Sequence, residues 1–141
     1  MKYRRFEDTI VARLDKGDEI MESIKTIIAA ENIKLAHVSA LGATDDFHIG
    51  VFDMTKKQYN KRHITGAVHE ICSLNGTINT MNGEPYIHVH ITAASGNGEV
   101  VGGHFIDGTI CLTCEMVITV IHGEIDRIHD DVLDINIYKM D

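Results

Sequence analysis

The chain has 141 residues, of which 44% are hydrophobic and 24% charged, and its formal net charge at pH 7 is −8. A chain of this size and composition is expected to form one globular domain over residues 1–141, and no apolar run reaches the ~20 residues of a membrane span. The 21 carboxylates against 13 basic side chains disfavour nucleic-acid binding, while three cysteines without a signal-like start favour a cytoplasmic location.

The first elements are an extended segment and a helix. Residues 3–14 look extended, and residues 15–18 supply N-cap chemistry and early negative charge for a helix over residues 18–31. The apolar residues of that helix recur at helical spacing and predict one buried stripe. They are Ile20, Met21, Ile24, Ile27 and Ile28. Asn32 is suited to a left-handed stop.

The remainder of the chain is predicted to be mostly strand. The expected strands cover residues 34–41, 47–53, 58–64, 70–80, 86–93, 100–106, 110–121 and 133–138. Short turns rich in Gly and Asn join several of them, so neighbouring strands must be antiparallel. One helix with such a sheet predicts an α+β fold in a single domain.

The strand at residues 110–121 is apolar on both faces. A single sheet covered by one helix can bury only one face, so the second face requires either closure of the sheet or a partner subunit. This pattern motivates a homo-oligomer. Cys111 and Cys114 lie in the same strand, where the spacing i, i+3 points them to opposite faces, and we interpret them as core residues.

Three histidines form the candidate functional site. His88 and His90 share one face of a strand, and residues 95–99 form a hairpin turn. If Ser95 pairs with Glu99, the same register sets His90 opposite His104. Three imidazoles would then converge as ligands of a divalent metal with an open fourth position, with zinc as the default ion. The alternative is that they line a polar sheet face or a subunit contact.

Glu115 is a further candidate, because an uncompensated carboxylate is costly within an apolar strand. It could accept a hydrogen bond from a metal-bound histidine, or form an ion pair across a subunit boundary. If the site holds a catalytic water, Glu115 is the nearest candidate for the general base. The sequence leaves open whether the protein is an enzyme.

The strongest basic patch consists of Lys56, Lys57, Lys61 and Arg62, with Tyr59 among them. Such a patch could contact the phosphates of DNA. The favoured interpretation is the solvated tip of a hairpin.

Several motifs together resemble the plants and prokaryotes conserved domain, written PPC or PCC. They occupy residues 14–20, 40–42, 70–76, 83–90, 101–104, 108–109 and 115–117. The resemblance implies a strongly bent, barrel-like antiparallel sheet that wraps one main helix, three subunits in a trimer, and histidines that bind a metal in some prokaryotic members. Plant members join the domain to a DNA-binding AT-hook, which this chain lacks, so the DNA-binding name of the family transfers poorly.

The resulting hypothesis is a cytoplasmic homotrimer with a divalent metal held by His88, His90 and His104, and with a small polar metabolite as its ligand. Two rivals remain open. One is a DNA-associated regulatory protein, and the other is a structural interaction module with a vestigial site.

Overall fold

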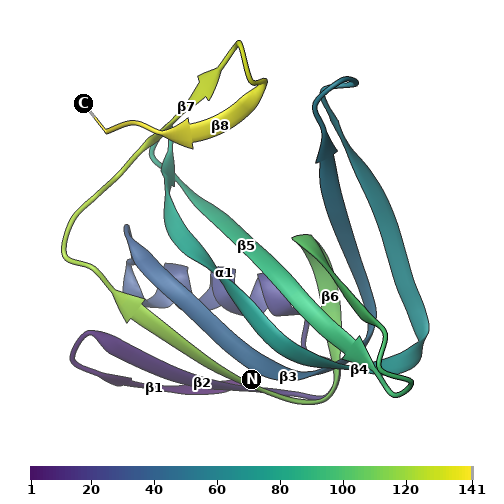
Figure 1. Cartoon of the computed structure of the whole chain (residues 1–141). Coiled ribbons are helices and arrows are strands. Elements are labelled where there is room, and N and C mark those ends of the chain that lie inside the picture. The colour runs from purple at the N-terminus through teal and green to yellow at the C-terminus, as the bar shows by residue number, and fades with distance from the viewer. Residues whose placement is uncertain (141) are drawn as a thin grey trace.

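The computed structural model describes residues 1–140, which form one helix and eight strands (Figure 1). In chain order the elements are β1 (Lys2–Phe6), β2 (Thr9–Asp15), α1 (Ile20–Glu31), β3 (Ala36–Asp53), β4 (Gln58–Met81), β5 (Glu84–Ser95), β6 (Val100–Val120), β7 (Arg127–Asp130) and β8 (Ile135–Tyr138). Among these residues no helix has the length and apolar character that crossing a bilayer requires.

The main sheet is antiparallel and its strands close a ring of hydrogen bonds. The strand order is β1-β2-β6-β3-β4-β5, and β6 also pairs with β5. The ring therefore comprises β6, β3, β4 and β5, with β2 and β1 continuing outward from β6. An antiparallel sheet with one helix is confirmed, although most of the chain is strand, so the label α+β describes it only loosely.

Three of the strands are much longer than expected. We expected separate strands at residues 34–41 and 47–53, but one strand, β3, runs through residues 36–53, and β4 and β6 likewise each replace two expected strands. Register shifts interrupt the pairing of β3 with β4 between Ala40 and Gly42 and between Thr44 and Asp46. Such bulges bend a strand without ending it. The distal parts of β3 and β4 consequently form a hairpin that rises away from the ring at the right of Figure 1.

The two ends of the chain also differ from expectation. The extended segment at residues 3–14 is a hairpin of β1 and β2 that turns at Glu7, whose φ is 51°. At the other end β8 lies within the strand predicted at residues 133–138, whereas its partner β7 was not predicted. This small two-stranded sheet stands apart from the main one at the top of Figure 1.

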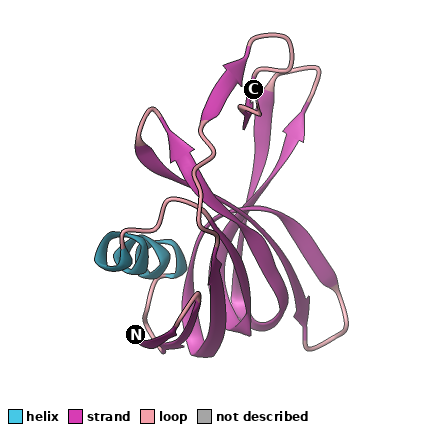
Figure 2. Cartoon of the chain, turned by 90° about the vertical axis from the view of Figure 1, so that its left-hand side faces the viewer, coloured by secondary structure: helices cyan, strands magenta, loops and turns pink. Residues whose placement is uncertain are grey.

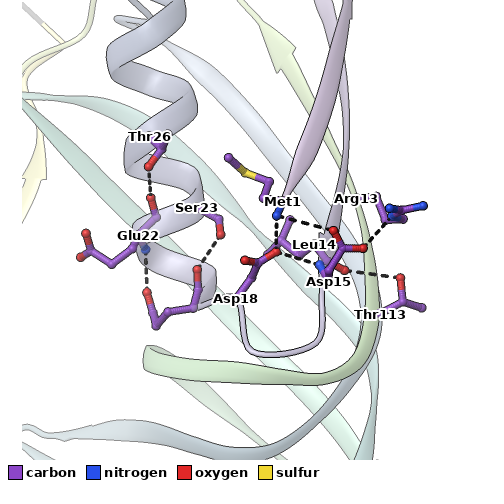
Figure 3. Close-up of polar contacts among 10 residues, drawn as sticks. Met1, Arg13, Leu14, Asp15, Asp18, Glu22, Ser23, Thr26 and Thr113 are labelled. Carbon is purple, nitrogen blue, oxygen red and sulfur yellow. Dashed lines mark hydrogen bonds and ion pairs between the residues drawn. The ribbon is translucent and has the colours of Figure 1, made fainter.

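The helix begins and ends through local hydrogen bonds. Its N-cap is Glu19, whose carboxylate accepts from the backbone N–H of Glu22 at 2.6 Å. Assigning the cap to residues 15–18 was wrong, because the Asp18 carboxylate instead accepts from the N–H of Asp15 and pairs with the amino terminus (Figure 3). Asn32 closes the helix in the left-handed conformation, as predicted.

One hydrophobic core joins the helix to the sheet. The predicted helical stripe is buried at Ile20, Ile24, Ile27 and Ile28, while Met21 is half-buried. These side chains form one cluster with Phe47, Phe105 and the inward residues of β6. Figure 2 shows the helix lying along one side of the strands.

Gly76 of β4 pairs with Val89 of β5, the residue between His88 and His90. A Cβ atom at position 76 would lie 2.6 Å from the Val89 Cα atom, too close for the two strands to remain where they are. We predict that Gly76→Ala destabilises the protein by about 1–3 kcal/mol, as overpacking does. Urea unfolding at fixed protein concentration measures this. Gly96→Ala is the matched control, because a Cβ there meets nothing within 4 Å; equal stability of the two variants would contradict the prediction.

Candidate metal centre

Two adjacent strands bring the three histidines together. His88 and His90 project from β5, and the pairing of β5 with β6 sets His90 opposite His104. The turn fixes this register, because the Ser95 N–H donates to the Glu99 carbonyl at 2.9 Å. The predicted register is therefore the observed one.

Glycines allow the strands to approach closely beside the cluster. A Cβ at Gly102 would lie 2.8 Å from the carbonyl oxygen of Ile91, and one at Gly103 would lie 2.8 Å from that of Gly50. Larger residues at these two positions would push β6 away from β5 or β3.

The imidazole rings converge on one point. Each histidine offers a ring nitrogen, and these three atoms all lie within 4.8 Å of one another. The Nε2 atoms of His88 and His90 are 3.2 Å apart. The ring centroids are separated by 5.1, 5.2 and 5.6 Å.

Burial keeps two of these rings in their neutral form. Desolvation lowers the pKa of His88 to about 4, and the nearby His104, Arg127 and His90 act in the same direction. The pKa of His104 is also lowered, first by burial and then by His90. Neutral imidazole is the form that ligates a metal. In addition, the buried Nδ1 atom of His104 has no hydrogen-bond partner among residues 1–140, which is unusual for a buried polar atom.

A cavity of about 290 Å³ opens beside His88 and His104. Tyr59 forms one wall, with its ring centroid 4.9 Å from that of His104. The opposite wall comes from the C-terminal hairpin and includes Arg127 and His129. Sequence reasoning missed Arg127, because β7 has only four residues and carries no clear alternation of polar and apolar positions.

Glu115 does not join the histidines within one chain. It is an exposed residue of β6, with Arg13 and Leu41 as its neighbours in the flanking strands. It lines a separate, wider cavity of about 690 Å³ on the outer face of the sheet. Within one chain Glu115 therefore lies outside the cavity that the histidines line.

The basic patch lies at the tip of the β3–β4 hairpin. Lys56 and Lys57 occupy its turn, and their side chains are exposed. Tyr59 is partly withdrawn from solvent, because its ring packs against Phe52 at 5.3 Å as well as against His104. It is therefore part of the histidine cavity.

The fold and the cluster define a small antiparallel-sheet protein with three convergent histidines. The model of the Plants and Prokaryotes Conserved (PCC) domain matches residues 1–122, so the chain belongs to this family. The match stops before β7 and β8. A comparison with curated proteins finds no match.

Three crystal structures of other proteins have closely similar folds. A metal-containing protein of Archaeoglobus fulgidus is 30% identical, covers 99% of both chains and has a TM-score of 0.87. A "putative DNA-binding protein" of Ralstonia eutropha is 25% identical, with a TM-score of 0.90 over 99% of this chain and 96% of that one. A plant- and prokaryote-conserved (PPC) protein of Pyrococcus horikoshii is 25% identical, with a TM-score of 0.85 over 98% of this chain and 93% of that one.

The lowered pKa of His88 predicts that the metal-free protein loses stability in acid. The unfolded chain binds a proton at His88 near pH 6.5, but the folded protein binds it only near pH 4. Stability from this group is therefore complete above pH 6.5 and falls as the pH drops toward 4. The C2 proton of His88, followed by NMR, should titrate near pH 4. A midpoint near 6.5 in the folded protein would contradict the assignment.

Proposed function

We propose that this protein binds one divalent metal ion per chain through His88, His90 and His104, and that the ion is zinc. The observation that supports this most directly is the convergence of three ring nitrogens within 4.8 Å. Imidazole nitrogens suit zinc and several other transition metals, and zinc commonly takes three protein ligands where it also binds a small molecule.

Other features of the site agree with a metal. The Nδ1 atom of His104 is buried without a partner among the described residues, and burial holds His88 and His104 neutral, ready to ligate. The similar protein of Archaeoglobus fulgidus is described as metal-containing. A divalent ion would supply Lewis-acid chemistry at the mouth of the 290 Å³ cavity, where a small polar metabolite can enter.

Asp134 is the one carboxylate among the described residues that line this cavity, and it lies 3.2 Å from the His129 ring nitrogen. Glu115, which the sequence suggested as a general base, lines the other cavity and would have to reach the site from another subunit. The proposed function is therefore the binding of a metal ion and a small ligand.

We further propose that residues 1–141 form a single domain and that three such chains assemble into a homotrimer. The apolar character of the outer face of β1, β2, β3 and β6 supports self-association. Large apolar side chains are exposed there around Glu115 and the 690 Å³ cavity. They are Phe6, Val11, Leu41 and Val117, with exposed fractions of 57, 46, 55 and 40%. Contiguous exposed apolar surface of this kind typically marks a contact between proteins.

Association with DNA is the second candidate, because the similar Ralstonia eutropha protein carries that description. The exposed lysines of the β3–β4 tip could contact phosphate. Against this, the net charge of −8 repels a polyanion. The third candidate function is a structural interaction module with a vestigial site.

The metal proposal is tested with protein purified without a histidine tag. Elemental analysis should find about one zinc ion per chain, and His104→Ala should lose most of it because one of the three ligands is gone. His122→Ala is the matched control, because His122 is exposed and lies outside the cluster, hydrogen-bonded to Asp8.

Equal metal content in both variants, or no bound ion in the wild type, would contradict the metal proposal. If the metal-free protein instead retarded duplex DNA at physiological salt, the regulatory function would be favoured. If the protein binds neither metal nor DNA, a structural interaction module is the function that remains.

The trimer is tested by placing a charge in the apolar face. Leu41→Asp sets a carboxylate beside Glu115, its neighbour in β6, so both desolvation and repulsion should oppose association. Light scattering should return the mass of three chains for the wild type and a smaller mass for the variant. Val132→Asp is the control, because this residue is 82% exposed on the C-terminal hairpin. A wild-type monomer at micromolar concentration would refute the proposal.

A further inference from the structure

Arg127 is buried in a way that is unusual for a charged side chain. It lies on β7 and is only 6% exposed. Its guanidinium carbon is 4.6 Å from the ring centroid of Tyr86 and 4.6 Å from that of Tyr138. The two rings therefore fix the plane of the guanidinium group.

The recorded hydrogen-bond partners of Arg127 are all neutral. Its Nε donates to the Asn79 side-chain oxygen at 3.1 Å, and its Nη1 donates to the Asn136 carbonyl at 2.8 Å. Arginine has five N–H donors, so these bonds leave others unengaged. Within residues 1–140 no carboxylate lies at ion-pair distance from the group, although buried charges are normally paired.

Arg127 faces the same cavity as the histidines. Both His88 and His104 line this cavity with it. The carboxylate of Asp134 also lines the cavity, but it lies 3.2 Å from the His129 ring nitrogen and forms no ion pair with the guanidinium. Arg127 therefore offers a buried guanidinium group that has no ion-pair partner among residues 1–140.

We propose that the cavity binds a small molecule bearing an oxyanion group, a carboxylate or a phosphate, that pairs with the Arg127 guanidinium. The proposal deepens the proposed function by naming the ligand class, and it rests on that function for the metal ion beside the ligand. The guanidinium presents planar donors that match the oxygens of either group.

Size and rigidity support a small anion. The volume of about 290 Å³ is at the lower end of the ~300–1,000 Å³ typical of ligand pockets. The stacking rings and the bonds to Asn79 and Asn136 hold the arginine in place before binding, so little side-chain entropy is lost when the ligand arrives. An anchor for the C-terminal hairpin alone would not require a charge, because a neutral side chain could fill the same space without burying one.

The test compares lactate with lactamide, which differ in the charge of one group. Ligand-observed NMR titrations use the full chain, both loaded with zinc and treated with a chelator. Lactate should bind at least about tenfold more tightly than lactamide, as a charged hydrogen bond implies. Arg127→Gln should abolish this preference, and Arg127→Lys should keep part of it. If inorganic phosphate displaces lactate at equal concentration, phosphate is the anion that the site binds more tightly.

Tyr138→Leu is the control for a purely structural role. Tyr138 stacks on Arg127 but is absent from the residues that line the cavity, so this variant loosens the hairpin and keeps the charge. It should retain the preference for lactate. If Tyr138→Leu loses the preference as fully as Arg127→Gln, or if the wild type binds both ligands equally, the proposal is overturned.

The outcomes separate the two proposals. An Arg127-dependent preference in a protein that takes up no zinc even when zinc is supplied would support the anion site and refute the metal site. A zinc-loaded protein without any preference for lactate would support the metal site and refute the anion site.

Discussion

The pairing of β5 with β6 is the constraint on which the candidate site depends. Side chains alternate between the faces of a strand, so a slip of one residue would turn His104 away from His90. The turn hydrogen bond from Ser95 to Glu99 sets the register. Gly76 and Gly102 allow the neighbouring backbones to approach within a distance that no Cβ would permit. The turn and the closely approaching backbones thereby gather the three imidazoles.

The cavity is built from two separate parts of the chain. The histidines lie within residues 1–122, which the PCC family model matches, whereas Arg127 and the hairpin of β7 and β8 follow that match. Arg127 ties this hairpin to Asn79 and Tyr86 and so closes one wall of the cavity.

Electrostatics separates the cavity from the rest of the surface. The chain as a whole is acidic, which opposes binding of a polyanion such as DNA. Inside the cavity Arg127 has no carboxylate partner among the described residues, while the Asp134 carboxylate contacts His129 instead. Burial also favours neutral over protonated histidine at positions 88 and 104. A divalent cation and a small anion are together compatible with these charges.

Short-range patterns determined the helix, its end at Asn32 and the alignment of His90 with His104, because each depends on spacing within a few residues or across one tight turn. The same patterns could not show that β3, β4 and β6 continue through bulges, since a bulge and a turn use similar residues. They also could not choose a face for Glu115, because its strand is apolar on both sides. The tertiary structure decided where the strands bend and which face Glu115 occupies. It alone placed Arg127 against Asn79, which lies 48 residues away in the sequence, because the C-terminal hairpin docks there.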